Sequence, residues 1–230
     1  MEHTIYDKRN YPIVDVQQGY GEWVKTYEQI VEDEMDVALL NRLESVDWSG
    51  AKQILDLACG TGRIGTWLKT RTSAPIDGID LTPEMLNVAR GKNLYRHLHI
   101  GDITRTGLSA GQYDLCTQSL ADEHLADIEP LYAEVARITK SGGKFVMVGF
   151  HPYFLMMGIP THFDNAEGQP ITIRSYVHLF SDHIRSAHKH GWTLVEMHEG
   201  LIDEAWLKKK AKWEKYYGIP ISFIFVWEKQ

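Results

Sequence analysis

Residues 55–65 have the sequence LDLACGTGRIG, and this stretch decides the fold. A short apolar run leads into Gly60, Gly62 and Gly65, and a helical pattern of apolar residues follows. Glycines at a strand-to-helix turn let the backbone approach a ligand at the helix N-terminus. The GxGxxG spacing is typical of dinucleotide sites. However, Asp56, four residues before Gly60, favours a ligand that carries an ammonium group over a pyrophosphate.

Short apolar runs alternate with helical patterns on both sides of this turn. Strands are predicted at 53–58, 75–81, 94–100, 112–118 and 144–150. Helices are predicted at 63–70, after Thr82, and from about residue 128 to just before Ser141. Strands that are apolar on both faces and alternate with helices predict a doubly wound α/β fold with a parallel sheet covered on both sides. Such a sheet binds its ligand at the carboxyl ends of the strands.

Further elements are predicted outside this alternation. Apolar residues at steps of three and four predict an amphipathic helix over 22–43, broken once at the acidic residues 32–34. Residues 151–174 are too long for a simple connection and are interpreted as a substrate lid. A helix at 176–190 and two antiparallel strands follow. The prediction is one domain, 1–230, made of an N-terminal helical cap (1–50), a core (51–150), the lid (151–174) and a C-terminal helix with closing strands (175–230).

Composition narrows the class of protein. The chain has 230 residues, 43% of them apolar, and a formal net charge of −7 from 24 Lys+Arg and 31 Asp+Glu. This acidic balance argues against a protein that mainly holds phosphate backbones. No apolar run approaches the roughly 18 residues of a membrane span, and the first ten residues lack a signal-peptide core, so a cytoplasmic location is expected. Two cysteines are too few for a disulfide framework or a four-cysteine zinc site.

The segment LDLACGTGR resembles motif I of the class I S-adenosylmethionine (SAM) dependent methyltransferases. Three further segments resemble that family in the same order: GIDLTPEML at 78–86, GDI at 101–103, and 113–148 with ARITKSGG. The resemblance implies a Rossmann-like, mostly parallel seven-stranded sheet with an antiparallel last strand. It also implies SAM as cofactor and S-adenosylhomocysteine as product. The pattern is most similar to the branch of quinone, biotin-pathway and natural-product methyltransferases.

The resemblance also implies which residues contact SAM. Asp56 would orient the methionine amino end, and Asp80 would accept both ribose hydroxyls. The other residues implied at the cofactor are Leu81 and Met85 around adenine, Asp102 and Ile103 at its polar edge, Tyr27 closing over the methionine end, and Ala58, Gly60, Thr61, Gly62, Gln118 and Ser119 along the backbone path. Trp23 and Tyr27 resemble an aromatic pair of the family, and core packing explains both equally well.

The acceptor site is expected between the sheet and the lid. Methyl transfer needs alignment and, for a neutral acceptor, a base. The candidate catalytic residues are His151, His162 and Tyr153, and for the histidines a bond to a backbone carbonyl is an equal alternative. The candidate acceptor-binding residues are Glu123, His124, Phe154, Met157 and Phe163. The apolar lid favours a small hydrophobic or aromatic acceptor, with O-methylation preferred because one base suffices.

Other classes are less well supported. His178, His183 and His188 are spaced by five and cannot share one helix face, so no metal site is predicted. Residues 118–121 lack the tetrapeptide of nucleic-acid amino methyltransferases, and the lysines of 208–212 are interpreted as a solvated helix face. Two alternatives stay open: a SAM-binding protein that does not methylate, such as a cyclase or a regulatory module, and a nicotinamide-dependent oxidoreductase. The oligomeric state is also open.

Overall fold

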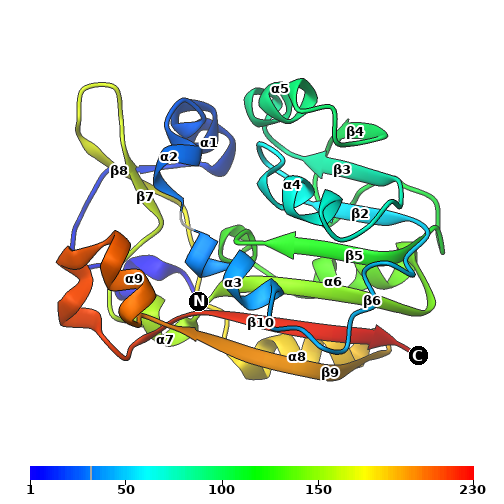
Figure 1. The fold of residues 1–230 in the computed structure, drawn as a ribbon. Helices are drawn as coiled ribbons and strands as arrows, with labels where there is room; N and C mark the ends of the chain where they lie inside the picture. Colours follow the sequence, from blue (N-terminus) through cyan, green and yellow to red (C-terminus); the bar gives the residue numbers. More distant parts are fainter. Residues whose placement is uncertain (32) are drawn as a thin grey trace.

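A seven-stranded sheet forms the centre of the molecule in the computed structural model, which describes residues 1–31 and 33–230 (Figure 1). Its strands, in spatial order, are β4 (His97–Ile100), β3 (Ile76–Asp80), β2 (Ile54–Leu57), β5 (Tyr113–Ser119), β6 (Thr139–Phe150), β10 (Pro220–Lys229) and β9 (Trp192–Leu201). All neighbours pair in parallel except β10, which is antiparallel to both β6 and β9. The predicted fold class, with its antiparallel last strand, is confirmed.

Helices cover both faces of the sheet (Figure 1). The principal ones are α4 (Arg63–Lys69), α5 (Pro83–Gly91), α6 (Glu129–Ile138) and α8 (Phe180–Lys189). Side chains alternate across each strand, so Ile54 packs in one core with α4, while Leu55 and Leu57 pack in the other core with α6 and α8. This two-faced burial explains why the central strands have continuous apolar sequences.

The N-terminal helix prediction is wrong in its extent. The structure has four short elements: α1 (Val16–Trp23), α2 (Tyr27–Ile30), η2 (Asp33–Met35) and α3 (Val37–Leu40). Asp15 caps α1 by accepting from the Gln18 backbone nitrogen, so this helix begins six residues before the predicted start. Asp36 caps a separate helix by accepting from the Val37 nitrogen. Residue 32, one of the three residues of the predicted break, lies outside the described residues.

The segment predicted as a lid contains regular structure of its own. It holds α7 (Pro152–Met156), β7 (His162–Asp164) and β8 (Pro170–Ile173). A second sheet, in the order β1-β8-β7, joins the lid to β1 (Ile13–Val14) near the N-terminus. The helix expected from residue 176 begins at Phe180 instead, where the Asp182 carboxylate accepts from the Leu179 nitrogen.

Two short elements, α9 (Glu204–Lys209) and η4 (Ala211–Tyr216), lie between β9 and β10. In Figure 1 they lie on the same side of the molecule as β7. The remaining short elements are η1 (His3–Ile5) and η3 (Asp122–His124). Across the described ranges, no helix has both the length and the apolar character to cross a membrane.

Candidate functional site

The glycine turn after β2 has the geometry that its sequence predicts. Ala58, Gly60 and Gly62 have positive φ angles of 51°, 53° and 83°, and α4 begins directly after Gly62. This left-handed backbone favours glycine. A Cβ on Gly62 would also lie 3.1 Å from the ring of Tyr95. The Gly60 nitrogen donates to Asp80 Oδ2 over 2.8 Å, which ties the turn to the end of β3.

A first cavity of about 240 Å³ lies at the carboxyl ends of β2 to β5. Asp80, Leu81, Met85, Asp102 and Ile103 line it, together with Ala58 and Gly60 of the turn. The rest of the lining is Val16, Tyr20, Tyr27, Thr82, Gly101, Ser119, Leu120, Ala121, His124 and Leu125. The structure therefore brings together most of the residues expected at the nucleoside end of the cofactor.

The acids of the first cavity differ in burial. Asp80 is buried, and its two oxygens accept from the nitrogens of Gly60 and Thr82, each over 2.8 Å. Burial raises the pKa of Asp80, and these backbone donors act against that shift. Asp102 is exposed and accepts from the Thr104 nitrogen over 2.7 Å. Asp80 is thus rigidly held, whereas Asp102 is at the rim.

A small recess adjoins the first cavity under the glycine turn. Its lining is Tyr27, Asp56, Ala58, Cys59, Gly60, Thr61, Arg63, Ile64 and Ser119. Asp56 is buried and accepts from the hydroxyls of Tyr95 and Thr117 over 2.7 and 2.9 Å. Burial raises the pKa of Asp56 to about 6 despite these two donors. A cationic group in the recess would stabilise the ionised carboxylate.

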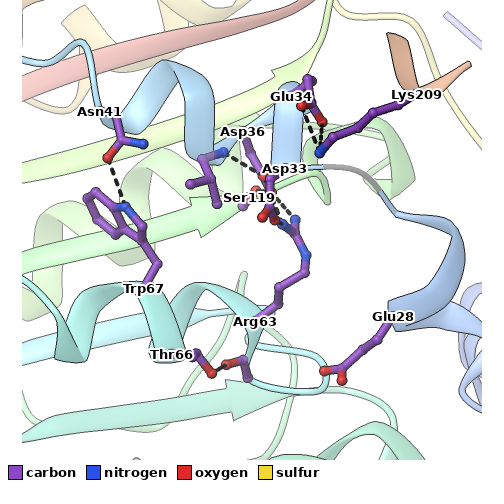
Figure 2. Close-up of polar contacts among 12 residues, drawn as sticks. Glu28, Asp33, Glu34, Asp36, Asn41, Arg63, Thr66, Trp67, Ser119 and Lys209 are labelled. Carbon is purple, nitrogen blue, oxygen red and sulfur yellow. Dashed lines mark hydrogen bonds and ion pairs between the residues drawn. The ribbon is translucent and has the colours of Figure 1, made fainter. Parts of the chain in front are cut away.

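Arg63 connects the recess to the N-terminal cap (Figure 2). Its guanidinium forms ion pairs with Asp33 and with Asp36, whose side chain is fully buried. Ser119 Oγ donates to Asp36 Oδ2 over 2.7 Å. Because these groups come from η2, α4 and the end of β5, the network fixes the cap above the recess.

A second cavity, also of about 240 Å³, lies between the cap, the lid and the α9–η4 segment. Its walls are mainly aromatic and aliphatic. The lining is Tyr20, Trp23, Tyr27, Ile30, Val31, Met35, Leu120, Phe150, Phe154, Ile159, Pro160, Thr161, His162, Phe163, Asp164, Trp206, Lys210, Lys212 and Trp213. Tyr20, Tyr27 and Leu120 line both cavities, so the two spaces adjoin at these three side chains.

Tyr20 is held in place at this junction by His124. His124 Nδ1 lies 2.8 Å from the Arg174 carbonyl, which can only accept, so Nδ1 carries the proton. His124 Nε2 then accepts from the Tyr20 hydroxyl over 2.9 Å. Burial lowers the pKa of His124 to about 4 and raises that of Tyr20. The pair is therefore neutral at physiological pH, and His124 lines the first cavity rather than the second.

The predicted residues of the acceptor side divide into two groups. His162, Phe154 and Phe163 line the second cavity. Tyr153 is 48% exposed and Met157 is the C-cap residue that follows α7, and neither lines the first or the second cavity.

His151 and Glu123 also lie outside the linings of both cavities. His151 Nδ1 accepts from the Tyr153 nitrogen over 3.1 Å and caps α7, while Nε2 lies 2.9 Å from Glu199 Oε1. Glu123 is buried, with Oε1 3.4 Å from Thr161 Oγ1, and burial raises its pKa to about 7. His151 is thus occupied by structural contacts, whereas Glu123 Oε2 is buried without a hydrogen-bond partner among the described residues.

Gln118 supports the turn after β5 and does not line either cavity. In the amide orientation that satisfies its hydrogen bonds, its oxygen accepts from the backbone nitrogens of residues 119–121. These residues line the first cavity, so Gln118 acts on the site through the backbone that it holds.

Sequence reasoning missed the wall of the second cavity that α9 and η4 supply. The lysines interpreted as a solvated face include Lys210 and Lys212, which line this cavity with Trp206 and Trp213. The two tryptophans among the lysines of 206–213 could have indicated this wall, because a fully solvated helix rarely contains large aromatic side chains. Tyr20, at the junction, lies before the start of the predicted helix.

Comparisons with known proteins identify the core. The family model described as "Methyltransferase domain" matches residues 55–147. The malonyl-[acyl-carrier protein] O-methyltransferase of Serratia marcescens is 35% identical over 92 residues, which are 40% of this chain and 36% of that protein. The ubiquinone/menaquinone biosynthesis C-methyltransferase UbiE of Bdellovibrio bacteriovorus is 34% identical over 124 residues, 50% of this chain and 53% of that protein. The chain thus spans between a third and about half of the length of these curated relatives.

Solved structures show the same fold over nearly the whole chain. An S-adenosylmethionine dependent methyltransferase from Mesorhizobium loti matches with a TM-score of 0.69 and 19% identity, covering 85% of this chain and 98% of that one. The putative methyltransferase solved with the Haloferax volcanii Trm112 activator matches with a TM-score of 0.70 and 18% identity, covering 93% and 97%. Residues 55–147 thus match a methyltransferase domain, and the chain as a whole is similar in fold to solved SAM-dependent methyltransferases.

Proposed function

We propose that this protein transfers a methyl group from SAM to a small hydrophobic or aromatic acceptor. The observation that carries the proposal is the pair of cavities that adjoin at Tyr20, Tyr27 and Leu120. One cavity has the glycine turn and a buried acid, and the other has aromatic walls. A donor in the first and an acceptor in the second would meet at the junction, and alignment of this kind is the main contribution of an enzyme to a displacement reaction.

The residues of the first cavity and the recess fit SAM. Each carboxylate oxygen of Asp80 accepts one hydrogen bond from a backbone nitrogen, so each still has a lone pair that can accept from a ribose hydroxyl. Asp56 in the recess suits the methionine ammonium. In the part of the chain that the structure describes, Arg63 Nε is buried without a hydrogen-bond partner, and it suits the methionine carboxylate. Bound SAM would supply the activated methyl group.

His162 is the candidate base, and it supports O-methylation as the preferred reaction. Its Nδ1 lies 2.8 Å from the Pro160 carbonyl, so Nδ1 carries the proton and Nε2 keeps a lone pair. Burial lowers the pKa of His162, which keeps the ring neutral and able to accept a proton. Because His162 lines the second cavity, that proton would come from an acceptor hydroxyl bound there.

The test is turnover. The native protein is incubated with SAM and a panel of small aromatic and aliphatic hydroxy, carboxy and quinol compounds, and S-adenosylhomocysteine is measured; calorimetry gives the affinities for SAM and for NAD. We expect SAM to bind, NAD not to bind, and methylation of at least one hydroxyl or carboxyl acceptor. SAM binding without turnover on any acceptor would favour a non-methylating role. No binding of SAM would overturn the proposal.

A non-methylating role is the second candidate, and one observation favours keeping it. The [4+2]-cyclase SpnF has the same fold, with a TM-score of 0.65 and 14% identity over 95% of this chain and 98% of that one. At this identity the likeness concerns the fold alone. The turnover experiment separates the two candidates.

A further inference from the structure

The strand β7 lies at the end of the second sheet, whose order is β1-β8-β7. One edge of β7 pairs with β8, and among the residues that the structure describes no strand pairs with the other edge. We propose that this free edge binds the acceptor through its backbone, and that the acceptor is a peptide-like compound whose secondary amides extend along β7. This inference rests on the proposed function, because it names the class of acceptor for the second cavity.

The backbone groups of His162 point away from β8. The Ile173 nitrogen donates to the Thr161 carbonyl over 2.9 Å, so these two residues form a hydrogen-bonded pair. The Thr172 nitrogen donates instead to the Pro12 carbonyl, on the side of β1. Hydrogen-bonded and non-bonded pairs alternate along an antiparallel ladder, so His162 and Thr172 form a non-bonded pair. The N–H and C=O of His162 are therefore directed to the free edge.

Asp164 has the same orientation two residues further along β7. The Asn165 nitrogen donates to the Gln169 carbonyl over 2.9 Å, which makes theirs a hydrogen-bonded pair. The adjacent pair, Asp164 with Pro170, is then non-bonded, and Pro170 has no N–H to contribute to the ladder. Among the described residues, no hydrogen bond satisfies the backbone N–H or C=O of His162 or Asp164.

The second cavity lies along this free edge. Residues 159–164 all line it, although consecutive side chains within β7 point to opposite faces of the strand. Its lining, as far as the structure describes it, includes no residue of β8, which a cavity over one face of the hairpin would include. The cavity therefore runs beside the backbone of β7, on the side away from β8.

An extended chain of amides is complementary to this edge. His162 and Asp164 each present one donor and one acceptor, with the two-residue spacing at which a neighbouring strand presents its own amides. A ligand without amides would fill the cavity and leave these backbone groups unpaired, and an unpaired buried polar group is costly. The edge therefore selects an acceptor that carries amide N–H and C=O groups.

The walls next to the edge suit apolar side chains of such an acceptor. Trp213 stacks on Phe154 with centroids 5.7 Å apart and an interplanar angle of 13°. Phe163, between the two outward residues, stacks on Trp23 at 5.5 Å, and Trp23 contacts Tyr27 with centroids 5.1 Å apart. Because Tyr27 lines both cavities, an acceptor along β7 lies beside the side chains that lead to the junction where the methyl group is expected.

The experiment compares two matched probes by calorimetry on the full chain with S-adenosylhomocysteine present. The first is N-acetyl-phenylalanyl-alanine N-methylamide. In the second, lactic acid replaces the alanine, so an ester oxygen takes the place of one N–H and the shape is retained. In either strand direction the amide probe can form one more hydrogen bond to the edge than the ester can. One hydrogen bond contributes about 1 kcal/mol, so the amide probe should bind about fivefold more tightly.

Two variants at one position locate the effect. Asp164→Pro removes the outward N–H and leaves the β7–β8 ladder intact, because proline is tolerated on an edge strand where its nitrogen faces away from the sheet. It should weaken binding of the amide probe about fivefold and keep the affinity for S-adenosylhomocysteine. Asp164→Ala is the matched control, since it also removes the carboxylate but keeps the N–H. It should bind the amide probe like the native protein.

The proposal is overturned if the native protein binds neither probe, if it binds the ester as tightly as the amide, or if Asp164→Ala weakens the amide probe as much as Asp164→Pro. The comparison of the two probes on the native protein decides the question even where the proline variant does not fold. A failure of the proposed function is recognised separately, as absent binding of S-adenosylhomocysteine or absent methyl transfer. The preference for the amide probe can be measured with or without that cofactor product.

Discussion

The contact between Arg63 and Asp36 gives the most quantitative prediction about the cap. Asp36 is fully buried and accepts from Arg63, from Ser119 Oγ and from the Val37 nitrogen. The side chain of Arg63 is 16% exposed, so Asp36→Ala leaves a largely buried guanidinium without its main partner. Breaking a buried ion pair by removing one partner costs about 3–5 kcal/mol. We expect the free energy of unfolding to fall by that amount.

Asp33→Ala is the matched control because Asp33 contacts the same guanidinium over 2.9 Å but is 62% exposed. Solvent screens this pair, and its loss should cost no more than about 1 kcal/mol. The assay is urea unfolding followed by circular dichroism, with linear extrapolation to water. Equal losses in the two variants would refute the reasoning, since they would show that burial does not determine the strength of these ion pairs. Asp36→Ala should also weaken SAM binding, because Arg63 and Ser119 line the recess.

Three further predictions concern the cofactor, the base and pH. Asp80→Ala should weaken SAM binding at least about tenfold by calorimetry, since a charge-assisted hydrogen bond contributes about 1.5–3 kcal/mol; unchanged affinity would contradict the assignment of the ribose site. With an acceptor that the native protein methylates, His162→Gln should lower kcat by about 100-fold and leave the Kd of SAM unchanged, whereas an unchanged kcat would exclude His162 as the base. Burial lowers the pKa of His183 to about 3. Between pH 6.5 and 3 the unfolded chain therefore binds a proton at this histidine and the folded chain does not. The contribution of His183 to the free energy of unfolding is complete above pH 6.5 and is lost as the pH falls. Between pH 7 and 5 the native protein should lose about 2 kcal/mol of its free energy of unfolding through His183, and the His183→Gln variant, measured by urea unfolding, should not show this loss. Identical pH profiles for the native protein and the variant would show that His183 is protonated in the fold.

The sheet could be predicted from the sequence because its signals are local. The apolar runs at β2, β3 and β5 each show burial on both faces, and the positive-φ positions Gly60 and Gly62 appear directly as glycines. The cap could not be predicted as well. Its apolar spacing is helical over 22–43, but Asp36 is committed both to capping α3 and to Arg63, and that tertiary contact overrides the local pattern.

The acceptor side depends on contacts between distant segments, which a local pattern cannot show. His151 follows β6 at the expected edge of the sheet, yet the pairing of β10 with β6 and β9 brings Glu199 to its Nε2. The same pairing brings the α9–η4 segment, which begins 30 residues after the end of the lid at residue 174, to the second cavity. Only the three-dimensional structure therefore identifies Trp206 and Trp213 as residues that line the second cavity.

The N-terminal segment, the lid and the turn after β5 form one connected cover over both cavities. β1 pairs with β8, and the Gly19 position of α1 lies so close to β8 that a Cβ there would be 2.7 Å from Ile173. His124 links the lid to α1, since its Nδ1 donates to the Arg174 carbonyl and its Nε2 accepts from Tyr20. The cap therefore cannot move away from the first cavity without disturbing the lid that walls the second. Because Tyr20 lines both cavities, we expect access of an acceptor and retention of the cofactor to be coupled through this side chain.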